Sequence, residues 1–373
     1  MLASLCASHQ VPSAQLVVRD ASGTTSESFG TAADTAFPLG SLTKPFTAAL
    51  AMILVEDGEI SLDEPLSEHL PDVDVTLRQV LSHTAGFASN IDEDAEQPAL
   101  RSHWFPRYWR ENGLVHPPGT VFSYSNVGYI VAGHLIEVLT GMDWAEAVAE
   151  ILLRPLGISV SGRETAEGHT VLPDGRVVGI GPQSALALED PNGGLALSAS
   201  DLLAAAGFCG EMVEDQLDSV AVGPFGMADG WGLGWARYGT WWGHDGTSDG
   251  TSCHFRFDPR SGHAVALTTN ASTGLDLWQD LVAKLGVPDY DPVDPGEPVQ
   301  PDPWAVGRYV NGPSEFVVSL HDGTLVLAPD TELTCYAGGR FTAQALPGSK
   351  FVLSGRFLPD SVQLSGRLAR RGG

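Results

Sequence analysis

The spacing of apolar and polar residues predicts helices flanked by strands. Residues 14–18 and the stretch that follows to Phe29 read as a hairpin, with a turn at residues 20–23. From Ser41 to Glu56 apolar side chains recur at helical spacing, and the run stops at Gly58. Further helices are expected near residues 77–83, 128–139, 144–153, 199–206 and 275–285. Residues 231–270 change to the period of antiparallel strands, with a hairpin turn at 258–262.

Strands at both ends of the first 285 residues, with helices between them, predict an α+β fold. One antiparallel sheet built from both ends and packed by helices is the natural solution. Residues 286–303 are rich in Pro and Asp and read as a linker. Residues 304–373 alternate short strand-like runs and turns, at 315–320, 324–327, 350–353 and 361–364. We therefore expect a catalytic domain over 1–285, a linker over 286–303 and a small, lipocalin-like β-barrel module over 304–373.

A polar and aromatic insertion interrupts the helical part at residues 88–116. It contains Trp104, Tyr108 and Trp109. Such a segment can form a lid over a pocket or a simple surface excursion, and the sequence leaves both open.

The formal net charge of −26 excludes whole classes of partner. Nucleic acids and anionic membranes need clustered Lys and Arg, so neither is expected to bind. Residues 1–20 show neither a basic segment nor a long apolar run, and we expect a cytoplasmic protein. The four cysteines are far apart, which predicts free buried thiols rather than a zinc site.

The most informative chemistry is Ser41-Leu-Thr-Lys44. Three residues are about one helical turn, so both side chains share one face. A serine hydroxyl is a poor nucleophile until a neighbour takes its proton, and a lysine can do this when burial lowers its pKa. Gly40 precedes the pair as a chain break, and Pro45 falls in the first turn, where a missing N–H is tolerated.

Two further triplets suit the same chemistry. In Tyr124-Ser-Asn126 the tyrosine can relay a proton, and the asparagine can hold both the lysine and a substrate amide. In His244-Asp-Gly246 the histidine can place a hydrogen-bond donor opposite the serine, and the glycine allows close approach. Both patterns recur at residues 309–311 and 321–323 with no nearby Ser-x-x-Lys, and we treat those copies as chance.

The wider segments around these motifs resemble the serine β-lactamase and penicillin-binding-protein-like superfamily, in its branch with class C β-lactamases, DD-peptidases and related esterases. The matching segments span about residues 12 to 285 and are strongest at 37–44, 81–86, 118–129, 192–201 and 244–246. The composition of these segments, together with the C-terminal module, also resembles the penicillin-binding-protein-type thioesterases and transacylases of actinomycete natural-product pathways.

The resemblance implies roles for the first two motifs. Ser41 would be the acylated nucleophile, and Lys44 and Tyr124 would share the role of general base, with no choice made between them. Asn126 would orient Lys44 and the substrate. His83, in the Leu81–Gly86 segment, is expected to be structural. No metal or organic cofactor is implied.

The resemblance also implies an oxyanion hole and a binding wall. The backbone N–H groups of Ser41 and Thr247 would stabilise the tetrahedral intermediate. His244 stands where the family has lysine, which weakens recognition of a substrate carboxylate. Gly246, Asp245 and Trp242 would complete the substrate-binding wall. Core packing is expected for most of the nearby tryptophans, which are Trp231, Trp235, Trp241 and Trp242.

These expectations lead to serine acyl transfer from an ester or thioester to an amine in secondary metabolism, without ATP. The partners would be a small-molecule or peptidyl donor and an amine acceptor. A carrier protein is an open alternative, opposed by the acidity of the chain. A cytoplasmic esterase, D-amino-acid amidase or β-lactamase-like hydrolase is the second hypothesis, and a non-catalytic acyl-binding protein is the third. We expect removal of residues 304–373 to spare acylation unless that module covers the site.

Overall fold

The computed structural model describes residues 1–92, 100–160, 162–172, 174–181, 187–205, 228–289, 296–344 and 352–372. Cys209, Lys350 and the expected helix end at Ala206 lie outside these ranges. Cys6, Cys253 and Cys335 are free and buried, as expected. In the described ranges, no helix combines the length and the apolar character needed to cross a membrane.

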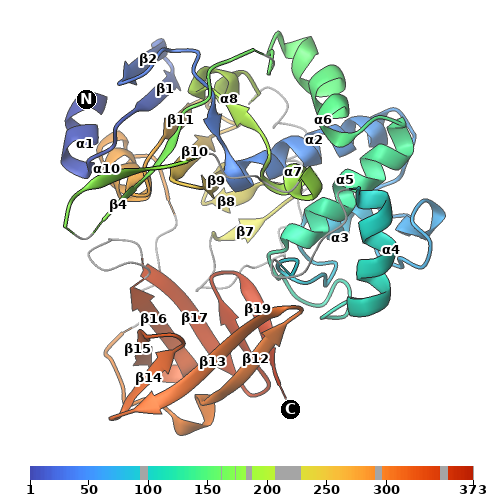
Figure 1. Ribbon diagram of the computed structural model, residues 1–373, viewed down its shortest axis with the longest axis vertical. Coiled ribbons are helices and arrows are strands. Elements are labelled where there is room, and N and C mark those ends of the chain that lie inside the picture. Colours follow the sequence, from blue (N-terminus) through green and yellow to red (C-terminus); the bar gives the residue numbers. More distant parts are fainter. Residues whose placement is uncertain are drawn as a thin grey trace.

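An antiparallel sheet of seven strands forms the centre of the first 289 residues, between two groups of helices (Figure 1). In spatial order its strands are β2 (Gly23–Phe29), β1 (Ala14–Asp20), β11 (Ala264–Thr269), β10 (Thr251–Phe257), β9 (Trp241–Ser248), β8 (Ala236–Tyr238) and β7 (Gly230–Trp231). The N-terminal hairpin pairs with the late strands, with Leu16 opposite Leu267. The predicted α+β sheet built from both ends of the segment is confirmed. Two small ladders, β3 (Phe37–Pro38) with β6 (Ala196–Leu197) and β4 (Gly168–Val171) with β5 (Val177–Ile180), accompany it.

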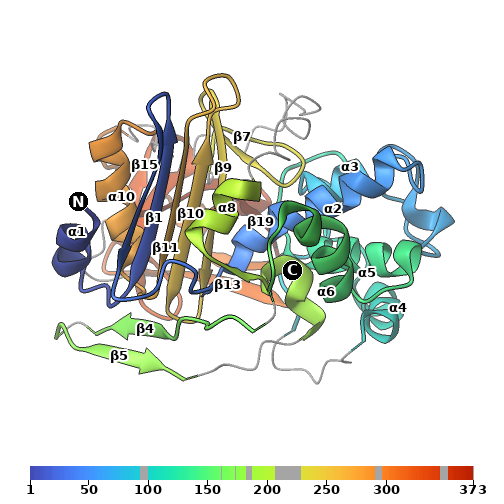
Figure 2. The ribbon, with the colours of Figure 1, turned by 90° about the horizontal axis from the view of Figure 1, so that it is seen from above.

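Helices cover both faces of the sheet (Figure 2). One face is covered by α1 (Leu2–His9) and α10 (Gly274–Leu285), whose side chains form a core cluster with β1 and β11. The other face carries α8 (Ala199–Ala205) and the helical body. The helices of that body are α2 (Lys44–Glu56), α3 (Leu77–Leu81), α4 (Arg101–Asn112), α5 (Asn126–Thr140), α6 (Trp144–Ala147), which continues as a π-helix over Val148–Leu153, and α7 (Asp190–Gly193).

The aromatic insertion is neither a lid nor a surface excursion where the structure describes it. Its residues form α4, in which Trp104 and Tyr108 stack with ring centroids 4.9 Å apart. Trp104, Phe105 and Tyr108 are all buried in the core that includes α5. The insertion looked polar because its apolar positions are aromatic and are interleaved with arginines.

The C-terminal segment is a closed barrel of eight antiparallel strands, as the expected β-barrel module requires. The strands are β12 (Gly307–Asn311), β13 (Ser314–His321), β14 (Thr324–Leu327), β15 (Thr331–Tyr336), β16 (Arg340–Gln344), β17 (Val352–Leu358), β18 (Ser361–Leu364) and β19 (Arg367–Arg371). Closure of β19 onto β12 pairs Arg370 with Val310. A closed barrel leaves no free sheet edge.

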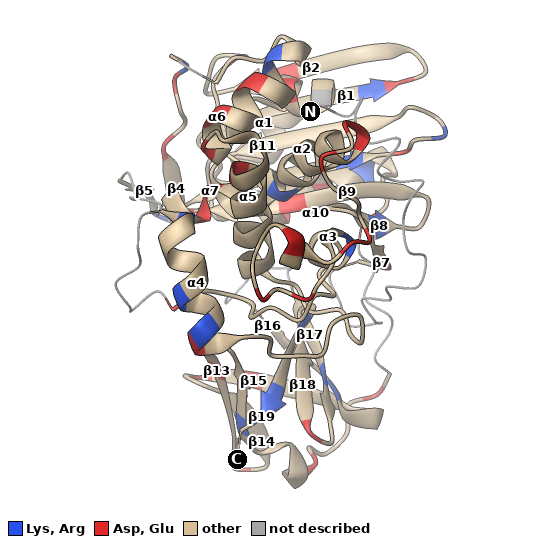
Figure 3. Ribbon diagram, turned by 90° about the vertical axis from the view of Figure 1, so that its right-hand side faces the viewer, with Lys and Arg blue, Asp and Glu red and all other residues tan. Residues whose placement is uncertain are grey.

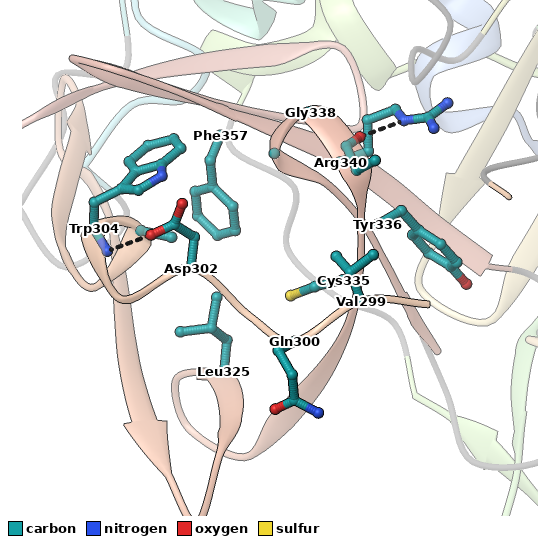
Figure 4. Close-up of a pocket in the computed structure, with 13 residues that line it drawn as sticks. Val299, Gln300, Asp302, Trp304, Leu325, Cys335, Tyr336, Gly338, Arg340 and Phe357 are labelled. Carbon is teal, nitrogen blue, oxygen red and sulfur yellow. Dashed lines mark hydrogen bonds between the residues drawn. The ribbon is translucent and has the colours of Figure 1, made fainter. Parts of the chain in front are cut away.

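A pocket of about 290 Å³ opens at one end of this barrel (Figure 4). Its walls include Trp304, Leu325, Cys335 and Phe357. None of the predicted catalytic residues lines it, so it is separate from the candidate active site.

Candidate active site

The nucleophile motif sits at a helix start, between the sheet and the helical body. Residues Gly40–Thr43 form a 3₁₀ turn, and α2 begins only at Lys44. Pro45 has no N–H to give to the carbonyl of Ser41, and the N–H of Lys44 donates to that oxygen instead. In a 3₁₀ turn the side chains at i and i+3 eclipse. This geometry puts Lys44 Nζ 3.0 Å from Ser41 Oγ.

Burial makes Lys44 a candidate base. Its side chain has no exposed surface, and its Nζ donates to the carbonyl oxygen of Asn192 at 2.9 Å. Burial, and secondarily the charge of Arg367, hold the pKa of Lys44 well below its usual range. The depressed pKa favours the neutral form of Lys44, which can take the proton of Ser41.

Two glycines let strand β9 press against the nucleophile turn. A Cβ on Gly246 would lie 1.9 Å from the carbonyl oxygen of Leu39. A Cβ on Gly40, whose φ is +52°, would lie 2.1 Å from the carbonyl oxygen of Thr247. The backbones of Ser41 and Thr247 are thus neighbours, as a shared oxyanion hole would require.

Tyr124 reaches the site from the loop before α5. Burial raises the pKa of Tyr124 to about 12, and the Ser41 hydroxyl and Arg367 oppose that rise. Its hydroxyl forms no hydrogen bond of regular geometry with the described residues, although Ser41 lies close enough to interact with it. Tyr124 is therefore a protonated phenol at neutral pH, suited to donate a proton first.

Asn126 lies at the start of α5 but does not bind Lys44. Its Nδ2 donates to Oδ1 of Asn90 at 2.9 Å, and its Oδ1 is buried without a partner among the described residues. The structure differs here from the expected Asn126–Lys44 contact, since the carbonyl of Asn192 takes that place. The sequence did not predict the contacts of Asn90 with Asn126 or of Asn192 with Lys44, because the partners in each pair lie far apart along the chain.

The third motif presents its residues on opposite faces of β9. His244 and Gly246 share the face toward the nucleophile turn, whereas Asp245 faces the other way. There Asp245 binds His254 and Arg256, with Asp245–Arg256 distances of 2.8 Å. These partners hold the pKa of Asp245 far below its usual range. Asp245 therefore anchors the strand and is not brought to the site.

The tryptophan at the site is Trp231 rather than Trp242. Trp242 is buried in the main hydrophobic core. The Trp231 ring lies edge-on to Tyr124 and His244, with centroids 5.5 and 5.3 Å away. His83 plays the structural part expected of it: its Nδ1 accepts the N–H of Ser125 at 3.0 Å and thereby fixes the Tyr124 segment.

The barrel completes the site, a feature that the sequence did not reveal. Its β18–β19 turn reaches the Tyr124 loop, where the carbonyl of Gly366 accepts the Tyr124 N–H at 2.8 Å. The guanidinium of Arg367 lies 5.0 Å from the centroid of the Tyr124 ring. Its Nε is buried and has no hydrogen-bond partner among the described residues. A positive charge therefore stands beside Tyr124 and close enough to Lys44 to lower the pKa of that lysine.

A buried asparagine clamps the barrel in place. Asn311 accepts the N–H of Ser89 at 2.6 Å and donates to the carbonyl of Leu368 at 2.7 Å. His116 donates to the same carbonyl at 2.9 Å. Asn311 belongs to the triplet that we treated as a chance copy of the second motif. Its hydrogen bonds link the barrel to the helical body.

Polar atoms without partners concentrate around Ser41. Native proteins leave few buried polar groups unpaired, because each one costs free energy. Within the described ranges, such atoms occur on Tyr124 itself and on six residues around the Ser41–Lys44–Tyr124 group: His83, Asn126, Asn192, Trp231, His244 and Arg367. A polar ligand bound here would satisfy them. The described residues hold no cluster of three or more His, Cys, Asp or Glu suited to a metal ion.

Replacing Lys44 by methionine should lower turnover and raise stability together. Loss of the base should cost at least ~100-fold in turnover. Because burial lowers the pKa of Lys44, the unfolded chain holds a proton on this lysine more tightly than the folded chain does, so the free-energy cost of burying Lys44 is largest at low pH and falls as the pH rises toward the ordinary pKa. We expect Lys44→Met to raise the free energy of unfolding at pH 7 by about 1 kcal/mol.

The stability gain of Lys44→Met over the wild type should narrow as the pH rises toward 10, because the lysine of the unfolded chain, with its ordinary pKa of 10.5, then begins to lose its proton as well. Urea unfolding of the wild type and of Lys44→Met at pH 7 and at pH 10 measures the difference between their free energies of unfolding. If the difference in free energy of unfolding between Lys44→Met and the wild type were the same at pH 7 and at pH 10, the pKa of Lys44 would not be depressed in the folded protein.

Comparisons with known proteins agree with this geometry. The sequence model of the Beta-lactamase family matches residues 1–283. Penicillin-binding protein 4 of Amycolatopsis lactamdurans is 31% identical over 330 residues, covering 74% of this chain and 85% of that protein. Unguisins hydrolase ungD' of Aspergillus campestris is 31% identical over 196 residues, covering 43% of this chain and 36% of that protein.

Solved structures of SurE align with the sheet, the helical body and the barrel together. The crystal structure of SurE aligns with 100% of this chain and 97% of that chain, at a TM-score of 0.85 and 34% identity. The crystal structure of SurE with D-Leu aligns over the same shares, at a TM-score of 0.82 and 33% identity.

Proposed function

Because the chain belongs to the β-lactamase family, we propose that it is a serine acyltransferase that moves an acyl or peptidyl group from an ester or thioester to an amine. The observation that carries the proposal is the contact between Ser41 and the buried Lys44, with 3.0 Å between Oγ and Nζ and with the pKa of Lys44 depressed. This pair supplies an activated nucleophile without a cofactor.

The steps follow from the protonation states. Neutral Lys44 takes the Ser41 proton as Oγ attacks the acyl carbon, and Tyr124 protonates the thiolate or alkoxide that leaves. The Lys44 proton then restores the Tyr124 phenol. In the second half an amine attacks the acyl carbon, its proton passes to this Lys44–Tyr124 pair, and Ser41 Oγ leaves with a proton. The N–H groups of Ser41 and Thr247 would hold the oxyanion in both halves.

Arg367 supports a substrate that carries a carboxylate. From the sequence we expected weak recognition of a substrate carboxylate, because His244 stands where the family has a lysine. The barrel supplies another cation, Arg367. A buried guanidinium nitrogen without a partner beside the reacting groups suits a carboxylate, which arginine binds with paired hydrogen bonds. SurE has been crystallised with D-Leu, which bears a carboxylate, and this supports an anchored carboxylate here.

The charge distribution weakens the objection to a carrier protein as donor. Residues 304–373 contain seven Lys or Arg and five Asp or Glu, whereas the whole chain has 20 and 46. The excess acidity thus lies outside the barrel, and Figure 3 shows basic residues on β19. An acidic carrier approaching on the barrel side would meet less repulsion. A carrier-bound thioester remains compatible with the site.

Hydrolysis is the second candidate, favoured by the similarity to unguisins hydrolase ungD'. The test is product analysis with a panel of peptidyl thioesters and methyl esters, with and without added amines. Amide that grows with amine concentration at the expense of free acid supports the transferase. Free acid formed at the same rate whatever the amine supports a hydrolase.

A further inference from the structure

His244 brings a ring nitrogen with an unpaired lone pair into the neighbourhood of Tyr124. It shares the inner face of β9 with Gly246, which touches the nucleophile turn, and its ring lies 6.3 Å from that of Tyr124, centroid to centroid. Its Nδ1 lies 2.6 Å from the carbonyl oxygen of Asp245. A carbonyl oxygen only accepts, so Nδ1 carries the hydrogen and, in the neutral ring, Nε2 is an acceptor.

The environment keeps the ring in this neutral form. Burial, and secondarily the repulsion from a protonated Lys44 in acid, lowers the pKa of His244 to about 3. The histidine is therefore neither the cation of the usual third motif nor the donor that we expected. Such a ring is also a poor proton acceptor, so the base must lie elsewhere, on Lys44 and Tyr124.

Nε2 of His244 is buried and lacks a hydrogen-bond partner among the described residues. An unpaired buried acceptor costs free energy, and a bound N–H or O–H donor would recover it. The groups on either side decide which molecule supplies the donor. In the proposed reaction Lys44 and Tyr124 handle the proton of whichever nucleophile approaches Ser41, and the His244 ring lies near both of them.

We propose that His244 Nε2 accepts a hydrogen bond from the attacking amine and thereby selects primary amines as acyl acceptors. This inference rests on the transferase proposed above. A primary amine has two hydrogens: one leaves to the Lys44–Tyr124 pair as the C–N bond forms and the Ser41 Oγ–C bond breaks, and the other stays bonded to Nε2. A secondary amine or an alcohol has only one, which the base must take, so Nε2 stays unpaired during attack.

The experiment compares alaninamide with its isomer sarcosinamide, a primary and a secondary amine of equal composition. Both compete for the acyl-enzyme formed from one thioester, and the ratio of the two amide products is divided by the ratio that the same amines give without enzyme. For the wild type we expect this quotient to favour the primary amine tenfold or more. In His244→Phe, which keeps an aromatic ring but has no acceptor, the quotient should fall to about one.

Two variants separate this role from packing. His244→Gln places an amide oxygen near the position of Nε2, and it should recover part of the preference. Trp231→Phe alters the neighbouring wall without touching the acceptor, so the quotient should stay while rates fall. The inference about His244 is wrong if the wild type forms both amides in the ratio of the uncatalysed reaction, or if His244→Phe keeps the wild-type preference. Either result leaves the proposed transferase activity standing. A wild type that forms no amide at all contradicts the transferase instead.

Discussion

Ser41→Ala should abolish turnover of every ester and thioester donor, with a loss on the order of 10⁴-fold or more. Oγ is the atom that becomes acylated, and no other serine hydroxyl contacts Lys44 in the described ranges. The side chain is small and partly exposed, so the fold should survive. Initial rates of thiol release measure the loss.

Ser22→Ala is the matched control for this variant. Ser22 lies in the exposed turn between β1 and β2, where its hydroxyl binds Asp20. The control should keep full activity. If Ser41→Ala released thiol at a rate close to that of Ser22→Ala, the nucleophile assignment would be wrong.

Arg367→Ala should lower kcat/KM for a carboxylate-bearing donor by roughly 100-fold, the cost of removing one partner of a buried charge pair. The methyl ester of the same donor, which has no carboxylate, should lose far less. The reason is that Arg367 is the cation that the barrel places over Tyr124. Arg367→Lys keeps the charge but not the paired donors, and should recover only part of the loss.

Arg356→Ala serves as the control within the barrel, since that guanidinium binds the carbonyl of Gly338 in the β15–β16 turn. It should leave both donors unaffected. Equal losses for acid and ester in Arg367→Ala would show that the arginine only packs against Tyr124, and no loss would show that it is not part of the site. We now expect removal of residues 304–373 to impair acylation, since Gly366, Leu368 and Asn311 hold the loops around Tyr124.

The sequence predicts best those features whose cause is local. Ser41 and Lys44 share one turn, and the Pro45 ring that shapes this turn is visible in the sequence. The helices after Ser125 and Trp144 and the strands Thr324–Leu327 and Ser361–Leu364 follow from their apolar spacing and appear where expected. The helix α4 was missed because aromatic side chains among arginines do not give a regular apolar stripe.

Features that depend on tertiary contact were not visible. Arg367 enters the site only because barrel closure and the β18–β19 turn bring it to Tyr124. The face that Asp245 occupies follows from strand alternation, but its partners on β10 could not be known beforehand. The acceptor nitrogen of His244 depends on the direction of one backbone carbonyl, which no residue pattern encodes.

Intact-protein mass after rapid mixing with a peptidyl thioester tests the central claim most directly. We predict an added mass equal to the acyl group, mapped to Ser41 by peptide sequencing, absent in Ser41→Ala, and discharged to an amide when a primary amine is added. An unmodified protein that nevertheless releases thiol, or an adduct on another residue, would contradict a Ser41 acyl-enzyme.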